Sequence, residues 1–205
     1  MIRLNKITFN IRSIILRGNQ IISCINYFPK TNECHCYIYS YSYTLTYYND
    51  ITNNFPGGLF KCVRKVSLYD ECPFEYEFFL QIAQSFPFMK KLTVHKRKSQ
   101  NNDNQQWSII ECFHLTELDL VRTHENYIEE FIINNKTHLL NNVTLHITYK
   151  SSQRITHNFT GDATRINCSK IDYIVLYSKP EFFFFEYLKD YFPHAEIVWL
   201  LPIMT

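Results

Sequence analysis

The sequence has little glycine, with four in 205 residues. Phosphate and dinucleotide cradles are built from glycine-rich loops that approach the ligand closely, so this scarcity counts against nucleotide-binding folds. No G-x-S-x-G, G-x-G-x-x-G or P-loop motif occurs. His124 and Glu125 begin an H-E-x-x-H zinc motif, but Ile128 stands where the second histidine is required. We therefore expect no catalytic activity and no cofactor.

Neither sign of charge dominates the chain. There are 21 lysines and arginines against 19 aspartates and glutamates, for a net charge of +2. The densest basic run lies between Lys90 and Lys98, and we interpret it as a solvated strand end and loop. No apolar stretch is long enough to cross a membrane, and the N-terminus has no signal-peptide pattern. These absences predict a chain that has neither nucleic acid nor membrane as a partner.

The seven cysteines are odd in number and irregular in spacing, which favours a reducing compartment, the cytoplasm or the nucleus, over a disulfide framework. Cys34, His35 and Cys36 form the only dense set of metal-ligand residues. Their one-residue spacing suits zinc poorly, and no second pair follows at finger spacing. We favour the alternative in which they belong to a strand, where Cys34 and Cys36 share one face and His35 takes the other.

One observation favours an extracellular protein instead. Four N-x-[ST] glycosylation sequons occur in the chain, although such tripeptides also arise by chance in an asparagine-rich sequence. They begin at Asn135, Asn142, Asn158 and Asn167.

What the chain does contain is a repeat. The apolar template L-x-x-L-x-L appears eight times, and its second position recurs at intervals of 24 to 29 residues. This interval is typical of leucine-rich repeats, and the near-constant register of the copies is more informative than any single match. The second position falls at Ile14, Tyr39, Val66, Leu92, Leu118, Leu145, Ile174 and Val198.

Helices are expected between these strands. Phe-Pro pairs such as Phe86-Pro87 and Phe192-Pro193 precede four of the strands, and proline marks a switch from helix to extended chain. Apolar residues at helical spacing form stripes in four intervening segments. The stripes are Phe79, Ile82, Ala83 and Phe86; Ile128, Phe131 and Ile132; Ile155, Phe159, Ala163 and Ile166; and Phe184, Phe185 and Leu188. Residues 46–62 and 99–106 are expected to be loops.

The pattern predicts a single α/β domain over residues 1–205. It would be a leucine-rich-repeat-like solenoid with a parallel sheet on the concave side and helices on the convex side. In an L-x-L strand the residues between the apolar positions face outward, so they would form a recognition surface for a protein partner. The candidate partner-binding residues are Lys65, Ser67, Tyr69, Lys91, Thr93, His95, Glu117, Asp119, His146, Tyr173 and Tyr177.

The segments VRKVSL, FPFMKKLTV and CFHLTELDL resemble the repeats of F-box/leucine-rich-repeat proteins. That resemblance implies a substrate receptor of a cullin ubiquitin ligase, in which the repeats bind a protein substrate and an F-box docks on the ligase adaptor. The first repeat strand is expected near Ile11, which leaves no room for an F-box in this chain. A ligase adaptor is therefore expected as a partner only if an F-box is supplied upstream, and the alternative is an extracellular leucine-rich-repeat binding protein.

Overall fold

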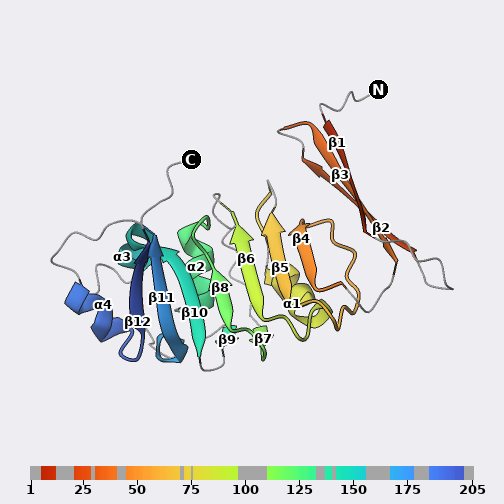
Figure 1. Ribbon diagram of the computed structural model, residues 1–205. Helices are drawn as coiled ribbons and strands as arrows, with labels where there is room; N and C mark the ends of the chain where they lie inside the picture. Colours follow the sequence, from red (N-terminus) through yellow and green to blue (C-terminus); the bar gives the residue numbers. More distant parts are fainter. Residues whose placement is uncertain are drawn as a thin grey trace.

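A computed structural model describes residues 6–12, 21–28, 31–40, 45–69, 72–74, 76–96, 110–132, 137–139, 142–155, 167–177 and 185–200. Its centre is a seven-stranded sheet in which every neighbouring pair is parallel. The spatial order of these strands follows their order in the chain (Figure 1). The strands are β4 (Tyr47–Ile51), β5 (Lys65–Tyr69), β6 (Lys91–His95), β8 (Glu117–Asp119), β10 (Val143–Thr148), β11 (Ile171–Tyr177) and β12 (Glu196–Leu200).

The predicted repeat register is confirmed over the five strands from β5 to β11. The second template positions are paired with one another from strand to strand, and their side chains are fully buried. These residues are Val66, Leu92, Leu118, Leu145 and Ile174. Because side chains alternate along a strand, this alignment also places the residues between them in rows on the opposite side of the sheet.

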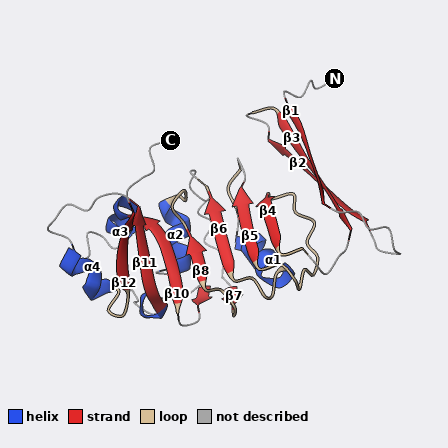
Figure 2. Cartoon of the chain, in the orientation of Figure 1, coloured by secondary structure: helices blue, strands red, loops and turns tan. Residues whose placement is uncertain are grey.

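Within the described ranges, four α-helices lie between strands of this sheet, and those that follow β5 and β8 lie behind the sheet in Figure 2. They are α1 (Tyr76–Ser85), α2 (Glu125–Ile132), α3 (Tyr149–Ile155) and α4 (Phe185–Tyr191). The helical stripes of α1 and α2 are confirmed. Of the third stripe, only Ile155 lies within the described residues, and it is the last residue of α3. The other three residues of that stripe lie outside the described ranges. The short strands β7 (Ile110–Cys112) and β9 (Thr137–Leu139) form a separate parallel pair.

Aromatic rings fill the space between the sheet and the helices. Phe60 stacks on Phe86 with 5.1 Å between ring centroids, and Phe79 meets Phe131 edge to face at 5.3 Å. The Phe74 amide donates to the buried Tyr127 hydroxyl over 2.9 Å, so the one polar atom of that ring is hydrogen-bonded. The high aromatic content therefore serves the core, where large rings bury much apolar surface.

Of the first two repeat copies, the second is wrong and the first stays a prediction. Ile14 lies outside the described residues, and Tyr39 belongs to a different sheet. That sheet has the order β1 (Lys6–Arg12), β3 (Glu33–Ser40), β2 (Ile21–Phe28), and β2 pairs with β3 in antiparallel fashion. It meets the larger sheet where the Phe28 ring lies 5.4 Å from that of Tyr69.

The loop expected over residues 46–62 is wrong in its first part, because β4 occupies it. The pairing of β4 with β5 shifts register between Tyr48 and Ile51, where Asp50 has a φ of 51°. The bulge places the two buried residues of β4, Tyr48 and Ile51, three positions apart. The template requires apolar residues two positions apart, so it does not identify this strand. The rest of the segment, including Gly57 with a φ of 79°, is loop as expected. The loop expected over residues 99–106 lies outside the described residues.

The last repeat copy is displaced by one residue. Ile197, and not Val198, pairs with Ile174, and Ile197 and Trp199 pack against the core. A shift of one residue turns every side chain of a strand to the other face, so Val198 and Leu200 point outward, with 41% and 43% of their surface exposed. The run from Ile197 to Leu200 is apolar at every position, so hydrophobicity alone does not fix which residues are buried.

The strand predicted at Cys34, His35 and Cys36 is confirmed as part of β3. The two thiol sulfurs lie 3.9 Å apart, while the His35 ring contacts Phe28 with 4.9 Å between centroids. Within the described ranges, no three histidine, cysteine or acidic side chains are grouped as metal ligands. Nor does this part of the chain contain a helix that is long and apolar enough to cross a membrane.

Because Cys112 is buried in β7, the free energy of unfolding changes with pH in the alkaline range. Burial raises the pKa of its thiol to about 12. Below about pH 9 the thiol is protonated in both the folded and the unfolded chain, and its full contribution to stability is present. As the pH rises from there toward 12, only the unfolded chain releases the proton, so stability is lost by about 1.4 kcal/mol per unit.

We expect Cys112→Val to remove this dependence, because valine is of similar size and does not titrate. Urea unfolding at pH 8 and pH 10 should show the wild type losing about 1.4 kcal/mol more than the variant between the two conditions. Equal losses would contradict the assignment.

Candidate protein-binding face

The side chains that point away from α1 and α2 form three rows across the seven-stranded sheet, which we name the sheet face. The strand pairing places all eleven predicted partner-binding residues in these rows. The first row holds Lys65, Lys91, Glu117, Thr144, Tyr173 and Glu196; the second holds Ser67, Thr93, Asp119, His146, Val175 and Val198; the third holds Tyr69, His95, Thr148, Tyr177 and Leu200.

Two of the predicted residues contact other parts of the chain. Ser67 is buried, with 4% of its surface exposed, and its hydroxyl donates to the carboxylate of Asp50 over 3.4 Å. Asp50 lies at the bulge of β4, a strand that the sequence did not predict. The ring of Tyr69 packs on Phe28, so this tyrosine joins the two sheets. The prediction that Ser67 contacts a partner is therefore corrected, because this side chain is covered. Tyr69 keeps 39% of its surface exposed, and its contact with a partner stays a prediction.

A chain of polar contacts crosses the middle of the face. The Lys91 ammonium pairs with Glu117, and the same carboxylate oxygen lies 3.1 Å from Nε2 of His146. Nδ1 of His146 lies 3.4 Å from the Tyr177 hydroxyl. The four residues come from β6, β8, β10 and β11, which are neighbours in the sheet. The sheet thus holds the centre of the face in one arrangement.

The direction of these hydrogen bonds follows from the groups involved. A carboxylate only accepts, so Nε2 of His146 carries the proton that it donates to Glu117. When the ring carries a single proton, Nδ1 is then the acceptor of the Tyr177 hydroxyl. Burial raises the pKa of Tyr177, Asp119 and Glu117 raise it further, and Lys91 opposes them. Tyr177 therefore keeps its proton at neutral pH and remains a hydrogen-bond donor.

The third row is uncharged at His95. Burial lowers the pKa of this histidine, as does the nearby Arg122, while Asp119 and Asp50 act in the opposite direction. The ring is therefore neutral at pH 7. Asp119 accepts the Val121 amide over 3.2 Å, so one carboxylate oxygen serves the turn after β8.

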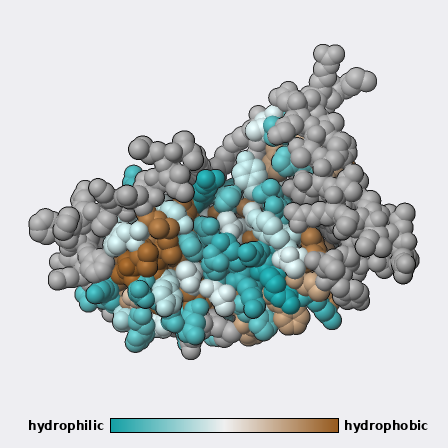
Figure 3. Space-filling model, in the orientation of Figure 1, coloured by the Kyte–Doolittle hydropathy of each residue, from teal (hydrophilic) through white to brown (hydrophobic). Residues whose placement is uncertain are grey.

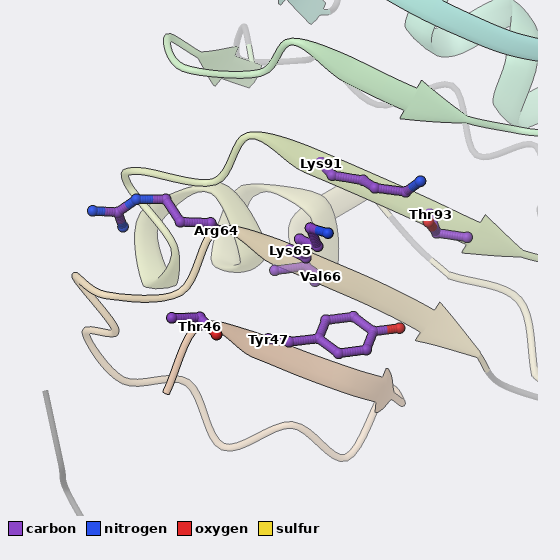
Figure 4. Close-up of a pocket in the computed structure, with 7 residues that line it drawn as sticks. All are labelled: Thr46, Tyr47, Arg64, Lys65, Val66, Lys91 and Thr93. Carbon is purple, nitrogen blue, oxygen red and sulfur yellow. The ribbon is translucent and has the colours of Figure 1, made fainter. Parts of the chain in front are cut away.

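A pocket of about 420 Å³ opens at the beginning of β4, β5 and β6 (Figure 4). Its lining includes three cationic side chains and no carboxylate. The lining residues are Thr46, Tyr47, Arg64, Lys65, Val66, Lys91 and Thr93. Arg64 is already occupied, since its guanidinium donates to the Lys61 carbonyl over 2.6 Å and lies 5.5 Å from the Phe88 ring centroid. The cations that face the pocket are therefore the two lysines.

The opposite end of the face is apolar. Val198 lies beside Val175, and Leu200 lies beside Tyr177, in the register of β12 with β11. Figure 3 shows hydrophobic residues gathered over these two strands, next to a hydrophilic region over β5, β6 and β8. Tyr173, with 48% of its surface exposed, belongs to the same end. Sequence reasoning missed Val198 and Leu200 because of the one-residue displacement, and missed Tyr47 because of the bulge in β4.

Comparison of the chain with protein-family models, curated proteins and solved structures finds no match.

Proposed function

We propose that this chain is a non-catalytic protein-binding module, a leucine-rich-repeat-like solenoid that holds another protein on its sheet face. The observation that carries the proposal is the alignment of exposed side chains in rows over consecutive parallel strands, with α1 and α2 behind them (Figure 1). A rigid sheet of this kind presents aromatic and charged groups at fixed spacing, which suits protein recognition.

The contacts at the centre of the face favour binding over catalysis. Glu117, His146 and Tyr177 stand in the order carboxylate, histidine, hydroxyl, as in a relay that activates a nucleophile. Such a relay requires the histidine to lie within normal hydrogen-bond distance of the hydroxyl, whereas Nδ1 of His146 lies 3.4 Å from the Tyr177 hydroxyl. The carboxylate is also shared with Lys91. The arrangement therefore orders side chains for contact with a partner.

The resemblance to F-box/leucine-rich-repeat proteins supports a proposal for the class of protein that the module binds. On that basis the bound protein is the substrate of a cullin ubiquitin ligase, and the adaptor of the ligase binds only where an F-box is supplied. The module acts in the cytoplasm or the nucleus.

The extracellular alternative is based on the four glycosylation sequons, and the structure counts against one of them. Asn167 is 4% exposed, and its side-chain amide donates to two buried carbonyls, so it is not accessible to a glycan. Asn142 is exposed, while Asn135 and Asn158 lie outside the described residues. Expression with a signal peptide, followed by a glycosidase gel-shift assay, distinguishes this alternative.

Site-specific photo-crosslinking tests the proposal. A photoreactive phenylalanine analogue placed at Tyr173 keeps an aromatic ring on the sheet face and should form an adduct with a partner in cells. The matched control is the same analogue at Phe113, which is 50% exposed on the turn after β7, away from the sheet face. We expect a discrete adduct only from position 173.

The result that would overturn the proposal is a pair of equal adduct patterns from positions 173 and 113, or adducts from position 113 alone. Mass spectrometry of the adduct from position 173 would also show whether ligase components accompany the bound protein.

A further inference from the structure

One of the two lysines of the pocket has no acidic partner within the described residues. Lys65 and Lys91 are paired in register on neighbouring parallel strands, and strands of this kind lie about 4.8 Å apart. Like charges side by side in a sheet repel one another. Glu117 neutralises Lys91, but Lys65 makes no ion pair within the described part of the chain. An anion in the pocket would therefore gain a favourable contact with Lys65 and would relieve the repulsion.

The apolar end of the face lies at a definable distance from this pocket. Five inter-strand steps separate β5 from β12 in the sheet order, which corresponds to about 24 Å. An extended peptide advances about 3.3 Å per residue, so it covers this distance in about seven residues. Val198 and Leu200, which are exposed beside Val175 and Tyr177, would bury apolar side chains there.

From these two observations we infer the chemistry of the partner, on the basis of the proposed function. The sheet face binds an extended protein segment that crosses the strands, with an anionic side chain at Lys65 and Lys91 and an apolar side chain, about seven residues away, on Val198 and Leu200. The anion is either the carboxylate of Asp or Glu or the phosphate of a phosphorylated residue. A lysine ammonium acts as a point charge and takes both.

Selection from a display library of random 12-residue peptides on the full chain tests this inference. We expect the selected peptides to carry Asp or Glu about seven residues from Leu, Ile, Val or Phe. The affinity of the chain for a synthetic copy of a selected peptide is measured by fluorescence polarisation. Lys65→Ala and Leu200→Ser should each lower this affinity about tenfold, as expected for the loss of one charge-assisted hydrogen bond or one buried apolar contact. The matched control Lys150→Ala removes an exposed lysine from α3 and should leave the affinity unchanged.

Changes in the peptide give a second readout. Gln in place of the acidic residue should weaken binding as much as Lys65→Ala does, and phosphoserine at that position shows whether phosphate serves as well as carboxylate. A charge exchange, Lys65→Glu against a peptide with Lys, should restore affinity.

Selected peptides that depend on Tyr173 but show no acidic preference would overturn the inference and leave the proposed function in place. If the affinity of the selected peptides did not change with Lys65→Ala, Tyr173→Ala or Leu200→Ser, the result would count against the inference and against the proposed function. A library without any binder would overturn the inference alone.

Discussion

Replacing Asn167 with alanine is expected to lower the free energy of unfolding by about 3 kcal/mol. The side chain is buried and donates its two N–H groups to the carbonyls of Phe131 and Thr137, over 3.1 and 2.8 Å. The Phe131 carbonyl belongs to the last turn of α2, where carbonyls have no partner within the helix. Alanine would leave both acceptors buried without a donor, and each such loss costs about 1–3 kcal/mol.

Urea unfolding followed by circular dichroism measures this effect, with Asn54→Ala as the control. Asn54 is an exposed asparagine of the loop after β4, so its truncation should change stability by less than about 0.5 kcal/mol. Asn167→Asp should be at least as damaging as alanine, because a carboxylate would face two carbonyl oxygens. If Asn167→Ala cost no more than Asn54→Ala, the two hydrogen bonds would not contribute to stability.

The strands that sequence reasoning located are those with a regular alternation of side chains. From Val66 to Ile174, each strand buries every second residue against the helices, so a template with apolar residues two positions apart identifies them and assigns their faces. The same alternation placed all eleven candidate residues on the side of these strands that faces away from α1 and α2, where Ser67 alone is buried.

The strands at the two edges could not be predicted in the same way. In β4 the bulge at Asp50 interrupts the alternation, and a bulge depends on pairing with β5 rather than on local hydrophobicity. In β12 both faces are apolar, so register is set by pairing with β11. The copy at Tyr39 has the apolar spacing of the repeat, yet β3 pairs in parallel with β1 and antiparallel with β2 in a separate sheet. Spacing along one strand does not determine which strands become its neighbours or their direction.

Two of the candidate residues are unsuitable for a test of the sheet face. Tyr69 contacts Phe28, and Asp119 accepts the Val121 amide, so their replacement would disturb the fold as well as the surface. Lys65, Thr93 and Tyr173 lie on β5, β6 and β11, and within the described ranges their side chains make no hydrogen bond or ion pair. They can be removed together at little cost in stability.

The triple variant Lys65→Ala, Thr93→Ala, Tyr173→Ala is therefore expected to lose its protein partner, with affinity reduced by about 100-fold or more. A tyrosine at the centre of an interface contributes about 2 kcal/mol or more, and the lysine adds a charged contact. Quantitative mass spectrometry of parallel affinity purifications measures the loss, and the melting temperature should stay within a few degrees of the wild type.

A second triple variant makes the comparison specific. Glu77→Ala, Gln84→Ala and Lys150→Ala remove three exposed side chains from α1 and α3, on the helical side of the sheet. It changes as many positions as the first variant, but it leaves every row of the sheet face intact, so the proteins captured by the wild type should remain. If the helical variant lost them while the face variant kept them, binding would belong to the helices, because only one side of the sheet would then have been altered in each case.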